Sequence, residues 1–156
     1  MIVTLLTALA GLLSALFAGF ALAMGTVING MLGDLPPEQY LSTMRGIITH
    51  GRTSVTVSGL VVGPVSLGIF LLLLRLPAID TPGFVLSAGG TAAHLTGALL
   101  VSRFVAEPLY DTIMAWDTPP TDWPDYRRRW ARINLIRALL PLLGAGLFFA
   151  AVLISQ

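Results

Sequence analysis

The chain has 156 residues, of which 55% are hydrophobic and only 11% charged, and it contains no cysteine. Soluble domains carry about 25% charged residues, so this composition excludes an ordinary water-soluble surface and indicates a chain folded in a lipid bilayer. The length fits one domain covering residues 1–156. The lack of cysteine excludes disulfides, thiolate metal sites and a cysteine nucleophile. The net charge of +1 gives no indication of a nucleic-acid partner.

The first apolar segment, residues 2–24, has the length of a membrane-spanning helix, because about 20 residues cross the hydrocarbon core. A cleaved signal peptide is the alternative, but the segment lacks a basic N-terminal region and exceeds the roughly 7–15 apolar residues of such a signal. We therefore expect a retained helix. Its glycines and alanines recur every three or four positions, a spacing typical of helix packing in lipid. Asn29 continues this stripe beyond the apolar run, which makes it a candidate for a hydrogen bond within the cytoplasmic end of the bundle.

Three further apolar segments lie near residues 54–76, 84–106 and 133–154. A Pro/Gly turn, "PAIDTPG", joins the second to the third and requires an antiparallel hairpin. The sequence therefore predicts an all-α, integral membrane four-helix bundle with antiparallel neighbours.

The arginine distribution predicts the orientation of this bundle. Eight of the nine arginines lie in or beside the two long connections, and only Arg75 borders the short one. Positively charged connections stay in the cytoplasm, so both termini are expected on the non-cytoplasmic side. The exclusive use of arginine, with abundant Ala, Gly and Leu, favours a high-GC bacterium and hence the bacterial inner membrane.

Two histidines and one glutamate are candidate functional residues. His94 falls inside the third apolar segment, where an ionisable group is costly and often functional; a neutral histidine bonded to Ser, Thr or a backbone carbonyl is the alternative. His50 precedes the second segment and is either a solvated rim residue or a general base. Together with Glu107 they would form an iron-binding set. However, thirteen helical residues separate His94 from Glu107 by roughly 20 Å, so no metal site is expected.

Glu107 and Asp111 stand four residues apart, on one face if a helix restarts near Pro108. One interpretation is an ion-pair network with the arginines of residues 127–132 that fastens the third connection. The other makes one carboxylate a proton acceptor. The sequence alone is compatible with both.

Trp130, Asn134 and Arg137 share one stripe of the last predicted helix, at i, i+4 and i+7. Arg137 lies inside the apolar run, so its side chain either extends to the interface or turns inward. Turned inward beside Asn134, it would stabilise a developing oxyanion. Trp130 is either an interfacial anchor or a stacking surface for a flat ligand.

The stretch "EPLYDTIMAWDTPPTDWPDYRRRWARINLIRALL" resembles the anthrone oxygenase-like family of small four-helix membrane proteins. The matching positions are Pro108, Leu109, Trp116, Asp117, Trp123, Arg129, Trp130, Asn134 and Arg137. The chain departs from the family pattern at Tyr110, where Asn is common, and at Glu107, where an apolar residue is expected.

The resemblance implies oxidation of an anthrone to an anthraquinone by O₂, without metal or flavin. It also implies the roles of particular residues. A base would be His50 or Glu107, and the oxyanion donors would be Asn134 and Arg137. The residues expected to bind the flat aromatic substrate are Asn29, His94, Tyr110 and Trp130. A different class of function also fits: a non-catalytic quinone- or lipid-binding subunit of a homo-oligomer or larger membrane complex.

Overall fold

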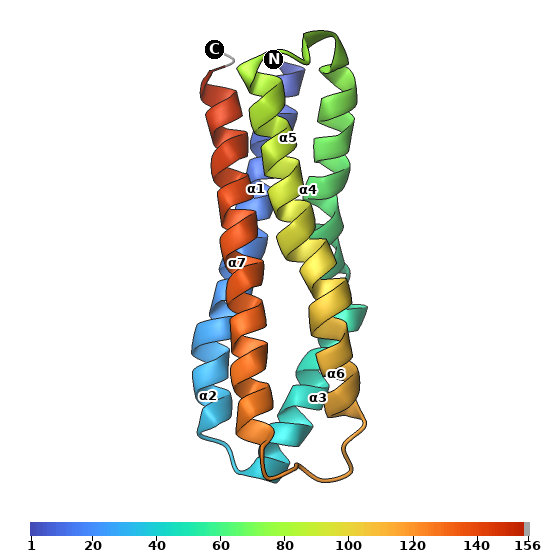
Figure 1. The fold of residues 1–156 in the computed structure, drawn as a ribbon, viewed down its shortest axis with the longest axis vertical. Helices are drawn as coiled ribbons and strands as arrows, with labels where there is room; N and C mark the ends of the chain where they lie inside the picture. The colour runs from blue at the N-terminus through green and yellow to red at the C-terminus, as the bar shows by residue number, and fades with distance from the viewer. Residues whose placement is uncertain (155–156) are drawn as a thin grey trace.

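The computed structural model describes residues 1–154, and within this range all regular secondary structure is helical. Four helical columns stand side by side, with both termini at the same end as the turn between the second and third columns (Figure 1). The predicted all-α membrane bundle is confirmed.

Each column is built from one or more helical segments. Column one contains α1 (Ile2–Ala23), the π-helical segment η1 (Met24–Ile28) and α2 (Asn29–Gly33). Column two contains α3 (Pro37–Thr53) and α4 (Val55–Leu74), followed by the short 3₁₀ turn η2 (Leu76–Ala78). Column three contains α5 (Pro82–His94), the π-helical segments η3 (Leu95–Leu100) and η4 (Ser102–Ala106), and α6 (Glu107–Met114). Column four is α7 (Trp123–Leu153).

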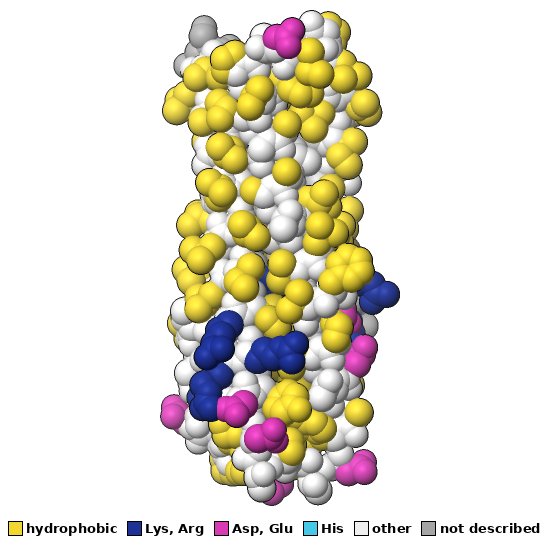
Figure 2. All heavy atoms as spheres, in the orientation of Figure 1, with side chains coloured by type: hydrophobic (Ala, Val, Ile, Leu, Met, Phe, Trp, Pro, Cys, Tyr) yellow, Lys and Arg dark blue, Asp and Glu magenta, His cyan; other side chains and the backbone are white. Residues whose placement is uncertain are grey.

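The outer surface has two chemical zones. Large apolar side chains cover the end that carries the termini, whereas arginines and acidic residues gather toward the opposite end (Figure 2). All four columns contain a helix long and apolar enough to cross a membrane, over residues 2–33, 55–74, 82–114 and 123–153. The chain is therefore a multi-pass membrane protein.

The third and fourth helices are longer than the sequence pattern predicted, and the excess lies at the arginine-rich end. The third extends to Met114 instead of ending near residue 106, and the fourth begins at Trp123 instead of residue 133. With 31 residues α7 is about 46 Å long, and α4 with 20 residues is about 30 Å. Because a hydrocarbon core is about 30 Å thick, only α4 matches it, and the other columns project beyond it.

The charged first connection contains a helix, α3, which the apolar segments did not predict. Pro37 starts it, and Tyr40, Met44 and Ile48 bury one face against α2 and α6 at the arginine-rich end. The chain then extends at Ser54, whose side chain accepts a hydrogen bond from the Val57 amide at 3.2 Å and so caps α4. Column two is thus interrupted at Ser54.

Small residues bring the columns into backbone contact. A Cβ atom added at Gly144 would lie 2.8 Å from the carbonyl oxygen of Gly90 on column three. One added at Gly97 would lie 2.6 Å from Pro141 Cδ. Lipid offers no hydrophobic drive for helix association, so such close approach contributes packing energy that larger residues would prevent.

Gly144→Ala is expected to destabilise the bundle by about 1–3 kcal/mol, because the new methyl group meets backbone that cannot rotate away. Gly146→Ala is the matched control, since a Cβ atom there has no neighbour within 4 Å. The free energy of unfolding in mixed detergent micelles measures both. Equal stability of the two variants would contradict the close contact.

The orientation in the membrane remains a prediction, and the cysteine-free chain makes it testable. Asp80 lies in the turn near the termini, and Thr118 lies in the connection at the opposite end; both are exposed. A membrane-impermeant maleimide added to intact cells should label an Asp80→Cys variant and leave Thr118→Cys unlabelled. The reverse pattern would place the arginine-rich end outside.

Candidate functional site

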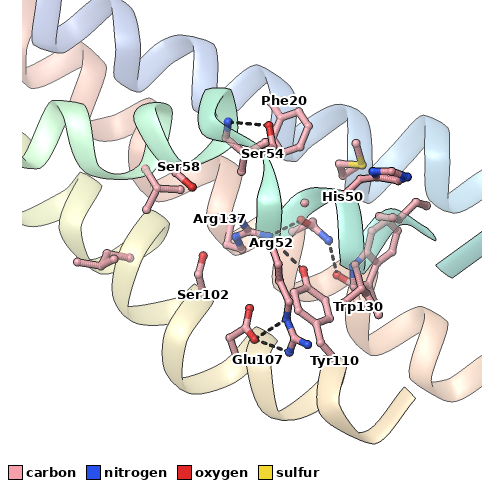
Figure 3. Close-up of a pocket in the computed structure, with 18 of the residues that line it drawn as sticks. Phe20, His50, Arg52, Ser54, Ser58, Ser102, Glu107, Tyr110, Trp130 and Arg137 are labelled. Carbon is pink, nitrogen blue, oxygen red and sulfur yellow. Dashed lines mark hydrogen bonds and ion pairs between the residues drawn. The ribbon is translucent and has the colours of Figure 1, made fainter. Parts of the chain in front are cut away.

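A pocket of about 680 Å³ lies beside the interruption of column two (Figure 3). Every column contributes to its wall. Its side chains with polar atoms are His50, Arg52, Ser54, Ser58, Ser102, Glu107, Tyr110, Trp130, Asn134 and Arg137. The pocket therefore brings together polar side chains from columns two, three and four.

Two backbone features open the space. The extended residue Ser54 separates α3 from α4, so column two has no continuous helix at this level. The three π-helical segments each contribute one lining residue, namely Met24, Leu99 and Ser102. A π-helical turn inserts an extra residue into a helix and often occurs at functional sites, because it redirects side chains.

Arg137 is the buried cation of the pocket, with 7% of its surface exposed. Its Nη1 donates to Asn134 Oδ1 at 3.0 Å and to the Tyr110 hydroxyl at 3.4 Å. The guanidinium carbon lies 5.4 Å from the centre of the Phe17 ring. Asn134 Nδ2 in turn donates to the Trp130 carbonyl at 3.0 Å. Asn134 therefore holds Arg137 in place, and its Oδ1 is already occupied.

No carboxylate of residues 1–154 pairs with Arg137. A buried charge normally has an ionic partner, because removing it from water is costly. Two buried N–H donors of lining residues also lack an acceptor, Arg137 Nε and Trp130 Nε1. Because buried donors are almost always satisfied, this part of the pocket is suited to a ligand that brings oxygen atoms and negative charge.

Arg52 makes an ion pair at the edge of the pocket. Its Nε donates to Glu107 Oε2 at 2.9 Å and its Nη2 to Asp111 Oδ1 at 2.7 Å. These two hydrogen bonds raise the pKa of Arg52 above its usual value. The guanidinium also lies 5.9 Å from the Tyr110 ring centre. Glu107 and Asp111 thus pair with Arg52. The prediction that they pair with the arginines of residues 127–132 was wrong.

The pairs link α3 to α6, but they are partly exposed. Exposed ion pairs contribute about 1 kcal/mol or less to stability. Their effect on the pocket is therefore chiefly geometric, since they set the distance between the two helices that carry His50 and Tyr110.

Six of the eight predicted site residues line this one pocket. They are His50, Glu107, Tyr110, Trp130, Asn134 and Arg137. His50 is exposed, and its imidazole makes no hydrogen bond within residues 1–154. Trp130 is buried and forms part of the wall.

Asn29 and His94 lie outside the pocket lining. The carbonyl and Oδ1 of Asn29 accept from Arg127 Nη1 at 2.9 and 3.2 Å. His94 is fully buried, with Nδ1 2.7 Å from Ser14 Oγ and Nε2 3.2 Å from the Val61 carbonyl. A serine and a backbone carbonyl are the partners expected if His94 has a structural role. Within residues 1–154 no three His, Asp or Glu side chains come together as metal ligands would.

Arg52 and Ser54 are not predicted as site residues, because the apolar segments indicate no helix over residues 37–53. A signal was present. Pro37 and Glu38 are typical of a helix start, and Tyr40, Met44 and Ile48 recur at four-residue intervals. Recognition of α3 would have placed Arg52 in its last turn, beside the rim where Glu107 was expected.

The fold and the pocket define a multi-pass helical membrane protein with a buried cationic site. Residues 49–147, more than half of the chain, match the sequence model of a family described as anthrone oxygenase. The chain belongs to this family. All six predicted residues that line the pocket fall within the matched segment. Comparison with curated proteins gave no match, and comparison with solved structures gave none.

Tyr40 anchors α3, the helix that carries one wall of the pocket. Its ring centre lies 4.4 Å from that of Trp123 on α7, and the side chain is fully buried. Burial raises the pKa of Tyr40 to about 12, against the opposing effect of the positive charge on Arg127.

Tyr40 should make stability fall at alkaline pH. Below pH 10 the phenol is neutral in the folded and unfolded chain, so its contribution is intact. Between pH 10 and about 12 only the unfolded chain ionises, which removes up to roughly 3 kcal/mol of stability. Unfolding measured across this range should show a steeper decline for wild type than for Tyr40→Phe. Identical slopes would mean that the folded protein ionises Tyr40 at its ordinary pKa.

Proposed function

We propose that this protein is an oxygenase that converts a flat phenolic anthrone to the corresponding quinone with O₂ and without a cofactor. The observation that carries the proposal is Arg137, a buried guanidinium that has no carboxylate partner within residues 1–154 and a free Nε donor. A substrate that becomes an anion in the pocket would supply the missing negative charge. Membership of the anthrone oxygenase family supports this choice of substrate class.

The chemistry requires only a base, an anion site and oxygen. Loss of a proton from the anthrone methylene gives an anion whose charge resides largely on the ring oxygen. This anion passes one electron to O₂, and the resulting radicals combine into a peroxide at the former methylene carbon. Protonation of the peroxide and loss of water leave the second carbonyl. One oxygen atom enters the quinone and the other leaves as water.

Arg137 would stabilise the anion in this sequence of steps. A preorganised donor in a site with little water lowers the energy of a developing oxyanion by several kcal/mol, typically about 3–4. Asn134 and Phe17 position the guanidinium, and Trp130 Nε1 offers a second donor to a substrate oxygen.

His50 is the better placed base. Its imidazole lines the pocket and makes no hydrogen bond within residues 1–154, so a ring nitrogen is available to accept the methylene proton. The other candidate, Glu107, already accepts from Arg52. Glu107 would instead fix the helix that presents Tyr110.

The size and walls of the pocket suit a three-ring substrate. A volume of about 680 Å³ lies within the usual range for small-molecule sites, roughly 300–1,000 Å³. Phe20, Tyr110 and Trp130 supply aromatic surface around it. We assign the protein to a bacterial inner membrane on the composition of the chain.

A second candidate function uses the same donors without chemistry. Arg137 Nε and Trp130 Nε1 would also satisfy the carbonyl oxygens of a bound quinone, as in a quinone-binding subunit of a larger membrane complex. The two candidates differ in turnover, since only the oxygenase consumes O₂.

Oxygen uptake by purified protein with emodin anthrone tests the proposal. Wild type should consume one O₂ for each quinone formed, faster than the spontaneous reaction and equally fast after treatment with chelator. Arg137→Gln should lower kcat by about 100-fold or more, because it removes the charge that stabilises the anion. Arg132→Gln is the matched control, since Arg132 is exposed on the same helix and does not line the pocket.

Two outcomes would count against this function. If folded wild-type protein gives no uptake above the spontaneous rate but binds the quinone, the binding-subunit function is the correct one. If Arg137→Gln and Arg132→Gln keep equal activity, the buried guanidinium is not the anion site.

A further inference from the structure

One side of the pocket is made by residues that also belong to the outer, lipid-facing surface. Val62 on α4 lines the pocket, yet 49% of its surface is exposed. Leu99 on η3 lines the same pocket and is half-buried. Between α4 and η3 the wall of the pocket is therefore no more than one side chain thick.

This thin part of the wall lies at the depth of the hydrocarbon core. Val62 is seven residues beyond Val55, the first residue of α4, which corresponds to about 10 Å along the helix. Because α4 is just long enough to cross the core, Val62 is well inside it. Ser58 on α4 and Ser102 on η4 extend from facing helices on the pocket side of this region (Figure 3).

The opposite boundary of the pocket has a different character. There Arg52 and Glu107 form their ion pair, and Asp111 adds a second carboxylate. An apolar ring system passing this boundary would have to displace hydrogen-bonded charges. At the Val62 side it would meet the aliphatic side chains of Val62 and Leu99 and the uncharged hydroxyls of Ser58 and Ser102.

We propose that the pocket receives its ligand directly from the bilayer, through a lateral opening between α4 and η3 that Val62 and Leu99 delimit. This inference rests on the proposed function for the class of ligand, a flat aromatic molecule with few polar groups. Such a molecule concentrates in lipid, as O₂ does, and reaches Arg137 without passing through water. Val62 and Leu99 are then the residues that limit the width of the ligand.

Ligand protection of single cysteines tests the opening. The chain has no cysteine, so Val62→Cys introduces one reporter at the opening. Ile69→Cys is the matched control, because Ile69 lies two turns further along the same helix stripe, is 51% exposed and does not line the pocket. The reagent is a lipid-soluble pyrene maleimide, and the protein is held in lipid nanodiscs.

Saturating 1,8-dihydroxyanthraquinone should slow the labelling of Cys at position 62 at least five-fold and leave labelling at position 69 unchanged. In parallel, Val62→Phe should slow association of the quinone several-fold, measured by quenching of tryptophan fluorescence, whereas Ile69→Phe should not.

The outcomes separate the opening from the function. Suppose that the quinone quenches tryptophan fluorescence but does not slow labelling at position 62, and that it associates with Val62→Phe as fast as with wild type. The ligand then enters elsewhere, and only the lateral opening is overturned. If the quinone fails to bind wild-type protein at all, both the opening and the proposed function are overturned.

Discussion

The bundle is organised around a guanidinium buried in a membrane protein without a carboxylate partner among residues 1–154. Arg137 is held by an amide, a phenol and an aromatic ring, all of which orient the charge and none of which neutralises it. Such an arrangement costs stability, because a fixed positive charge is poorly solvated at this depth. The cost is offset when an anion forms next to it, so the same feature that weakens the empty site favours a reaction that generates negative charge.

The backbone around Arg137 is irregular, and this irregularity makes room for the pocket. Column two stops at Ser54 and resumes in a new direction, while columns one and three widen into π-helical segments at the pocket. The remainder of the bundle is tightly packed, with Gly90 and Gly144 in backbone contact. The columns pack closely toward the termini. Toward the arginine-rich end, the interruption at Ser54 and the π-helical segments leave space for the pocket.

The apolar segments predicted the four columns, because crossing a bilayer imposes a length and a composition that a sequence displays directly. The stripe of Trp130, Asn134 and Arg137 also predicted one wall of the site, since one helix fixes their spacing. Side-chain contacts between different helices could not be predicted from the sequence. Arg52 replaced the arginines of residues 127–132 as the partner of Glu107, because α3 was hidden in a polar stretch whose buried face has only a few apolar residues. The hydrogen bonds of His94 to Ser14 and Val61 likewise depend on three helices meeting at one depth.

The length of α4 couples the pocket to the lipid. With 20 residues α4 matches a core of ordinary thickness, whereas the neighbouring columns exceed it. Hydrophobic mismatch therefore acts chiefly at Ser54, where the extended backbone separates α3 from α4 and column two is not one continuous helix. A thicker bilayer would draw this residue and the adjoining Arg52 toward the hydrocarbon, and a thinner one would release them into the headgroups. Bilayer thickness thus acts on Ser54, the link between α3 and α4 that borders the pocket.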